Sequence, residues 1–171
     1  MSYTSRNAAL NILSDVEKGS FLNLAVKRYL PLIKKEEDRR FCAALAYTTI
    51  ENLIRIDYVI DNFVAKKKLQ KVIRNILRLG VCQLMFFEAV PQSAAVNESV
   101  KLCHKCGKSQ MKGFVNGVLR NISGSMGSVE YPKEEENPAQ YLSVMFSYPK
   151  WICEKFICDF GYEKACELLS Y

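Results

Sequence analysis

Three short stretches decide the fold: Leu77-Arg78-Leu79-Gly80-Val81-Cys82-Gln83-Leu84, Ala95-Val96-Asn97-Glu98 and Gly113-Phe114-Val115-Asn116-Gly117-Val118-Leu119-Arg120-Asn121. In these stretches, apolar residues recur every three to four positions, which is the period of one face of an α-helix. The other faces carry Asn, Gly and Arg residues that helix formation alone does not require. We therefore expect a helical core with an outer surface that has a function.

Helical periodicity extends over most of the chain. Residues 3–18, 69–87 and 111–122 each carry a continuous apolar stripe. The stripe over residues 41–63 is too long for one typical helix, so a break is expected near residues 51–54. The sequence shows no β-type alternation of useful length. It predicts an all-α protein of nine or ten helices.

The composition changes after the third of these stripes. Residues 124–138 contain Pro132 and the acidic run Glu134-Glu135-Glu136, which is typical of a loop or linker. We expect residues 1–123 to form the main helical domain. Residues 139–171 would then form a small helical segment.

Composition narrows the class of protein. Of the 171 residues, 49% are hydrophobic and 25% charged, as in ordinary globular proteins. No apolar run reaches the roughly 18 residues of a membrane span, and the N-terminus lacks a signal-peptide core. The seven cysteines fall mostly in apolar helical patterns, where they resemble buried small hydrophobes. We expect a cytoplasmic protein with no membrane association and no disulfide framework.

Basic residues are clustered on one predicted helix. The net charge is +6. Lys67, Lys71, Arg74 and Arg78 fall within about 60° of one another around the helix axis. They lie opposite the apolar stripe, and no acidic residue occurs between Lys66 and Phe87. Such a ridge suits a phosphate backbone, although a merely solvated face has the same pattern.

Two glycines interrupt the polar side of the predicted 111–122 helix. Gly113 and Gly117 lie there with Asn116 and Arg120. Each interior glycine costs about 1 kcal/mol relative to alanine. They imply the close approach of either a neighbouring helix or a ligand such as an RNA backbone.

The chain offers no evident catalytic or metal chemistry. Cys103-His104-Lys105-Cys106 supplies two thiols, whereas a closed zinc site needs four ligands. No nucleophile can be paired with His104, and no phosphate-binding glycine motif occurs. We predict no catalytic residue, no metal site and no cofactor site in this chain.

The three quoted stretches resemble the NusB family of RNA-binding domains. Within it, two groups are similar: the NusB antitermination factor and the N-terminal domain of the Sun/RsmB (Fmu) 16S ribosomal RNA cytosine-C5 methyltransferases. The "LRLGxxQL" pattern of residues 77–84 favours the second group, as does Arg120, where the antitermination factor typically has an acidic residue. The segment Phe146-Ser147-Tyr148-Pro149-Lys150-Trp151 resembles the connection to the methyltransferase core.

This resemblance implies a NusB-like helical bundle followed by a small helical linker subdomain. It implies that the parent enzyme methylates 16S ribosomal RNA with S-adenosylmethionine. The chain would bind or position RNA beside its own catalytic domain. Because it has no Pro-Cys motif and no glycine-rich cofactor loop, we expect a non-catalytic truncated chain or a protein reduced to its recognition domain.

The expected phosphate contacts are basic side chains: Arg6, Lys67, Lys71, Arg74, Arg78, Lys112 and Arg120. Two alternatives stay open. The chain could be a NusB-type transcription antitermination factor that binds a leader RNA. It could also be a helical domain whose basic surface contacts acidic protein.

Overall fold

The computed structural model describes residues 3–65 and 68–171. Every regular element in these ranges is an α-helix or a short 3-10 turn, which confirms the predicted all-α class. The helices are α1 (Ser5–Glu17), α2 (Leu22–Tyr29), α3 (Glu36–Glu51), α4 (Leu53–Phe63), α5 (Lys71–Phe86), α6 (Gln92–Lys105), α7 (Lys112–Ser125), α8 (Pro138–Phe146), α9 (Lys150–Phe160) and α10 (Tyr162–Leu169).

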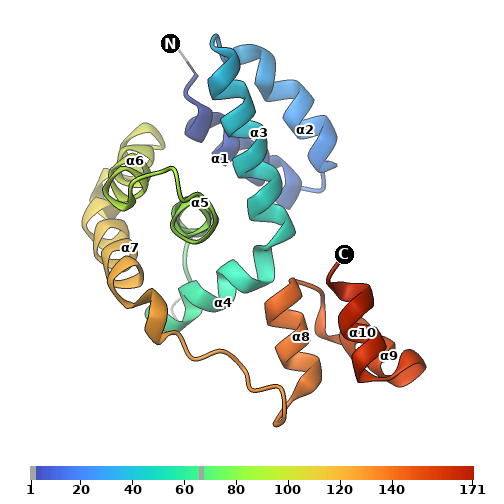
Figure 1. The fold of residues 1–171 in the computed structure, drawn as a ribbon. Coiled ribbons are helices and arrows are strands. Elements are labelled where there is room, and N and C mark those ends of the chain that lie inside the picture. Colours follow the sequence, from blue (N-terminus) through green and yellow to red (C-terminus); the bar gives the residue numbers. More distant parts are fainter. Residues whose placement is uncertain (1–2, 66–67) are drawn as a thin grey trace.

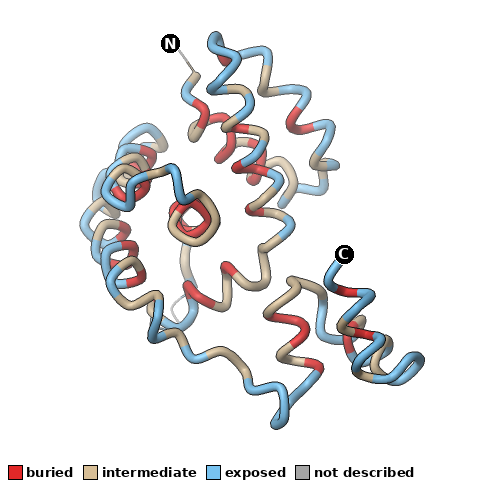
Figure 2. The backbone as a smooth tube through the Cα atoms, viewed as in Figure 1, coloured by how far each residue is buried: buried red, intermediate tan, exposed pale blue. Residues whose placement is uncertain are grey.

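Helix α5 is the centre of the bundle. Figure 1 shows it end-on, with α1, α3, α4, α6 and α7 packed around it. Most of its turns are buried (Figure 2), including the polar residues Asn75 and Gln83. A helix that is buried nearly all round must accommodate several neighbours at once. At Gly80, an added Cβ would lie 2.8 Å from Leu119 Cδ1 and 2.9 Å from Ser99 Oγ. Glycine there allows α6 and α7 to approach α5.

Local signals fix several helix ends. The Thr4 hydroxyl accepts a hydrogen bond of 3.2 Å from the Asn7 N–H and caps α1. The predicted break near residues 51–54 is confirmed at Asn52, between α3 and α4. Helix α7, in contrast, continues to Ser125, beyond the predicted end at residue 122. Its continuation brings Met126 onto the main core, and this packing outweighs the weak helix propensity around Gly124.

Helices α8, α9 and α10 share a small core of their own. Its buried residues come from all three helices: Ala139, Leu142, Cys153, Ala165 and Leu169. Pro138 occupies the first position of α8, and the Asn137 side chain caps that helix. The connecting segment, residues 126–137, runs along the bundle (Figure 1) and packs Val129 and Tyr131 against the main core.

The connecting segment is attached to α4 by an aromatic stack around Arg55. The Arg55 guanidinium lies 5.5 Å from the ring centroid of Tyr131 and 5.9 Å from that of Phe86. Tyr131 stacks in turn on Tyr58, with 5.8 Å between the ring centroids. The backbone N–H of Arg55 donates a hydrogen bond of 3.0 Å to Ser147 Oγ, at the end of α8. These contacts hold both the segment and α8 against the bundle.

Candidate nucleic-acid interface

The predicted basic ridge on α5 is largely neutralised by acidic residues of other helices. Arg78 contacts Asp57 on α4, with Nη2 to Oδ2 at 2.7 Å, and Glu17 on α1, with Nη1 to Oε1 at 3.0 Å. Arg74 Nη2 lies 2.8 Å from Asp61 Oδ1. The expectation of four free cations on a solvent-facing ridge is therefore wrong for these two arginines. Helix α5 has no acidic residue of its own because the acidic partners of its arginines lie on α1 and α4.

Arg78 is the more deeply placed of the two, with an 11% exposed side chain. Burial by itself lowers the pKa of Arg78, but the hydrogen bonds and charges of Asp57 and Glu17 outweigh it and raise the pKa. Arg78 thus joins α1, α4 and α5. Lys71 is exposed at the first residue of α5, and Lys67 lies outside the described residues. RNA contact by these α5 residues stays a prediction.

Arg6 lies at the other end of α1 and is half-buried. Its Nε donates a hydrogen bond of 2.8 Å to Gln83 Oε1, and its guanidinium lies 4.7 Å from the centroid of the Phe41 ring. Burial lowers the pKa of Arg6, while the charges of Glu98 and Asp38 act in the opposite direction. Arg6 therefore belongs partly to the packing of α1, α3 and α5.

An uncompensated basic surface lies instead on α6, α7 and the connection between them. The sequence has no Asp or Glu between Glu98 and Glu130. Lys101 is paired with Glu98 at 2.6 Å. In the described ranges, no carboxylate lies within ion-pair distance of four other cations, which we call the α6–α7 basic surface: Lys105, Lys108, Lys112 and Arg120.

This surface includes two of the predicted contacts, Lys112 and Arg120. Lys105 and Lys108 were missed, although the acid-free segment that marks them is readable from the sequence. Lys105 extends toward the start of α1, where its Nζ lies 3.4 Å from Thr4 Oγ1. The basic surface thus reaches the N-terminal end of the bundle.

The glycines of α7 face open space. Gly113 and Gly117 are exposed, and a Cβ added at either would have no neighbour within 4 Å. The alternative of close contact with a neighbouring helix is therefore wrong for these two positions. Beside them, Arg120 Nε donates a hydrogen bond of 3.0 Å to Asn116 Oδ1, one turn earlier on the same helix. The outer face of α7 is bare along its centre and cationic along one edge.

A hollow of about 330 Å³ adjoins Arg120, where α7 passes the start of α6. Its lining is small or polar: Gln92, Ser93, Val96, Arg120, Ser123 and Gly124. Ser123 Oγ donates a hydrogen bond of 2.7 Å to Gln92 Oε1 across its floor. No side chain caps the start of α6, so the first backbone N–H groups of this helix donate no hydrogen bond to a capping side chain. The hollow extends the polar surface beside the basic edge of α7.

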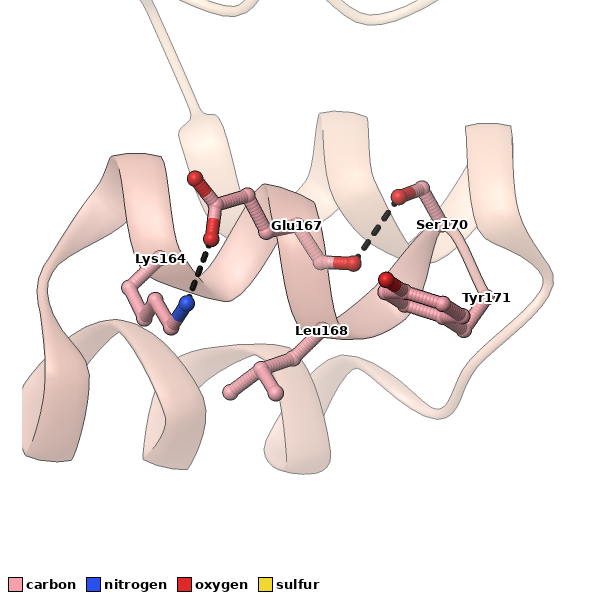
Figure 3. A pocket seen from close by; sticks show the side chains of 5 residues that line it. All are labelled: Lys164, Glu167, Leu168, Ser170 and Tyr171. Atoms are coloured by element: carbon pink, nitrogen blue, oxygen red, sulfur yellow. Dashed lines mark hydrogen bonds and ion pairs between the residues drawn. The ribbon is translucent and has the colours of Figure 1, made fainter.

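Neither the cysteine motif nor the C-terminal hollow forms a catalytic arrangement. Cys103 is buried, whereas His104 is exposed with its Nδ1 2.9 Å from Ser109 Oγ. Within residues 3–65 and 68–171, no three His, Cys, Asp or Glu side chains gather as a metal site would require. The hollow in Figure 3 is lined by α10 and the two residues that follow it, and Lys164 pairs there with Glu167 beside the exposed Tyr171.

The buried thiols provide a test of the packing. Burial raises the pKa of both Cys42 and Cys82 to about 12. At pH 8, only about one in ten thousand of these cysteine side chains is then ionised. The thiolate is the form that reacts, so both cysteines should react very slowly in the folded protein. We expect a maleimide to label exposed Cys158 in the native protein and to label Cys42 and Cys82 only after unfolding in urea. Peptide mass spectrometry measures this, and equally fast native labelling at Cys82 would contradict the packing.

The helical bundle belongs to a class of proteins with known members. The chain belongs to the NusB family, whose model matches residues 3–124. Relatives include the probable ribosomal RNA small subunit methyltransferase B of Bacillus subtilis (strain 168), 29% identical over 94% of this chain and 36% of that protein. The protein of the same name from Synechocystis sp. (strain ATCC 27184 / PCC 6803 / Kazusa) is 30% identical over 98% and 38%.

A second type of relative is shorter. The transcription antitermination protein NusB of Bacillus mycoides (strain KBAB4) is 29% identical over 72% of this chain and 97% of its own length. The predicted resemblance is thus confirmed. The chain spans less than two fifths of the methyltransferase relatives that it matches. Among the helices that the structure describes, none has both the length and the apolar character to cross a bilayer.

Proposed function

We propose that this chain is the RNA-binding and RNA-positioning domain of a 16S ribosomal RNA cytosine-C5 methyltransferase of the cytoplasm. The observation that carries the proposal is the α6–α7 basic surface, whose four cations have no acidic partner in the described residues. Unpaired cations on rigid helices attract phosphates, and this electrostatic attraction supplies much of the affinity for nucleic acids. Phosphate contacts of this kind orient an RNA without reading its sequence.

The extent of the similarity favours the methyltransferase over the antitermination factor. The methyltransferase relatives match 94% and 98% of this chain, so their similarity extends beyond the main bundle into the C-terminal helices. The antitermination relative matches 72%. Arg120 supports RNA binding under either alternative, because a cation on the outer face of α7 favours a phosphate contact.

The chemistry of methyl transfer is assigned to no residue of this chain. S-adenosylmethionine would supply the methyl group in the proposed parent enzyme. The residues present do not fit that cofactor, because the described part of the chain has no strand followed by a glycine-rich loop. The role proposed for this domain is therefore binding and orientation.

Charge reversal on α7 tests the function. The protein should bind 16S fragments with a log–log salt slope of about −3 to −4, since four phosphate contacts each contribute roughly −0.7 to −0.9. The double variant Lys112→Glu with Arg120→Glu should lose at least about tenfold in affinity and have a slope shallower by about 2. Fluorescence anisotropy at several salt concentrations measures both.

The matched control has the same change in net charge on the far side of the bundle. Lys27 and Lys34 are exposed near α2, which Figure 1 shows away from α6 and α7. Lys27→Glu with Lys34→Glu should leave RNA affinity nearly unchanged, and an equal loss would contradict the assignment to α7. Preference for a leader RNA over 16S fragments would favour the antitermination factor. Binding to neither RNA would overturn the RNA-binding function.

A further inference from the structure

Three exposed apolar side chains lie close together in the sequence around α2, on the side of the bundle away from α6 and α7 (Figure 1). Phe21 is 75% exposed, Leu24 52% and Leu32 49%. In the described part of α1–α7, the other exposed large hydrophobic residues are Tyr47 and Phe114, each alone on its helix. Single exposed apolar residues are ordinary, whereas a group of them bordered by polar residues marks an interaction site.

The helical period places these side chains along one row. At about 100° per residue, Phe21, Leu24 and Arg28 project within about 60° of one another around the axis of α2. Leu32 is exposed in the 3-10 turn that directly follows this helix. It lies about three helical turns beyond Phe21, or roughly 17 Å along the axis at 1.5 Å per residue. The row is therefore long enough to contact three successive turns of another helix.

The same segment is basic and has no acidic residue of its own. The sequence contains no Asp or Glu between Glu17 and Glu36. Arg28 is paired with Asp15 at 2.7 Å. In the described ranges, no carboxylate lies within ion-pair distance of any lysine of this segment. We call the three apolar residues and three exposed lysines that flank them the α2 face: Phe21, Leu24, Leu32, Lys27, Lys34 and Lys35.

We propose that the α2 face binds an acidic amphipathic helix of a protein partner. Leucines on three successive turns of such a helix cover Phe21, Leu24 and Leu32, and carboxylates beside its apolar stripe pair with the lysines. Covering the apolar row supplies affinity, while the opposite charges fix the orientation and accelerate the encounter. This inference goes beyond the proposed function, because it concerns a second face of the bundle and a partner that is a protein.

A protein helix matches this face better than RNA or lipid does. Leu24 and Leu32 have no π face on which a base can stack, and the arginine of the row is already paired with Asp15. An anionic lipid surface carries negative charge throughout, and the exposed Glu37 and Asp38 at the start of α3 would be repelled by it. A helix can place its carboxylates beside the lysines and leave those two acids without contact.

The test uses the full chain and three fluorescent synthetic peptides of about 16 residues, or four to five helical turns. The first has leucine on every turn of one face and glutamate on both sides of it. The second has lysine in place of each glutamate, and the third is the first in scrambled order. Fluorescence anisotropy should show that the acidic peptide binds at least about tenfold more tightly than either of the others. Its affinity should fall as salt is raised, because ion pairs at the exposed rim are screened.

A pair of double variants assigns the binding to the apolar row. Phe21→Ser with Leu24→Gln removes most of it, and serine suits the N-cap position that Phe21 occupies. This variant should lose at least about tenfold in affinity for the acidic peptide and keep full affinity for 16S fragments. Trp151→Ser with Phe160→Gln is the matched control, because it removes side chains that are 65% and 54% exposed from α9. The control should bind the peptide as the wild type does, and circular dichroism checks that each variant is folded.

A charge variant tests the lysines separately. Lys27→Glu with Lys34→Glu leaves the apolar row intact, so it should still fold and still expose the three apolar side chains. It should lose the preference for the acidic peptide over the lysine peptide, because the flanks of the row are then no longer cationic.

The outcomes separate this proposal from the proposed function. Equal binding of the three peptides, or full peptide affinity after Phe21→Ser with Leu24→Gln, overturns the α2 proposal. Loss of 16S binding in that variant assigns the face to RNA, and sedimentation with phosphatidylglycerol vesicles in place of peptide binding assigns it to lipid; either result overturns the proposal. The RNA-binding function is unaffected by these failures, because it is measured with RNA and depends on the α6–α7 basic surface.

Discussion

The free energy of unfolding of a Gly80→Val variant should be about 3 kcal/mol lower than that of the wild-type protein. The first added carbon would lie 2.8 Å from Leu119 Cδ1 and 2.9 Å from Ser99 Oγ, and both side chains are buried. Overpacking of a filled core costs about 1–3 kcal/mol, and valine adds two methyl groups beyond the clashing position. Urea unfolding followed by circular dichroism measures the difference.

Gly117 provides the matched control, because it is also an interior helical glycine. Nothing lies within 4 Å of an added Cβ there, so Gly117→Ala should stabilise the protein by about 1 kcal/mol. Gly80→Ala should destabilise it, because the steric conflict exceeds the gain in helix propensity. Effects of the same sign at the two positions would contradict the packing of α6 and α7 on α5.

An Arg78→Met variant is expected to lose about 3 kcal/mol of stability. Arg78 is 11% exposed, and its partners Asp57 and Glu17 have side chains 26% and 28% exposed. Removing the cation leaves Glu17 with no cationic partner and leaves Asp57 with only the longer contact of 3.4 Å to Arg74. Breaking a buried pair costs about 3–5 kcal/mol. The lower end applies here, because the carboxylates keep some solvent. Urea unfolding again measures the change.

Arg74→Met is the control for that change. Its closer partner Asp61, at 2.8 Å, has a 60% exposed side chain, and its second contact, with Asp57 Oδ1, is longer at 3.4 Å. Arg74 should therefore contribute only about 1 kcal/mol or less. A further variant, Glu17→Gln with Arg78→Met, should recover part of the lost stability because the carboxylate that has lost its cationic partner is removed. An equal loss from Arg74→Met and Arg78→Met would show that burial does not set the strength of these pairs.

The helical fold could be predicted because its signals are local. The apolar stripes along α1, α5 and α7 have the helical period, and each of these helices forms where its stripe predicts it. The extension of α7 to Ser125 could not be predicted in this way. It depends on the packing of Met126 against a core assembled from other helices.

The charges show why the candidate site was harder to predict. Arg78 looks unpaired when α5 is considered alone, because its partners Asp57 and Glu17 are distant in sequence and become neighbours only in the folded chain. Lys112 and Arg120 also lie in a segment without acids, between Glu98 and Glu130. In the described residues the fold brings no carboxylate within ion-pair distance of them, and the sequence alone could not show this difference from Arg78.

The glycines support the same distinction. Gly80 lies within the apolar stripe of α5 and is required by close packing, whereas Gly113 and Gly117 lie opposite the stripe of α7 and face open space. The position of a glycine relative to the apolar stripe therefore predicts whether close packing requires it. The number of glycines in a helix does not predict this.

The stack of Arg55 on Tyr131 has a consequence for effective concentration. A flexible tether over residues 126–137 would have a root-mean-square span of about 19 Å. With Tyr131 fixed on the bundle, only residues 132–137 remain as tether, and their span is about 13 Å. Because effective concentration falls as the −3/2 power of tether length, halving the tether raises the local concentration of α8 at α4 by about threefold. The stack thus assists the docking of α8 through chain geometry, in addition to the hydrogen bond between Arg55 and Ser147.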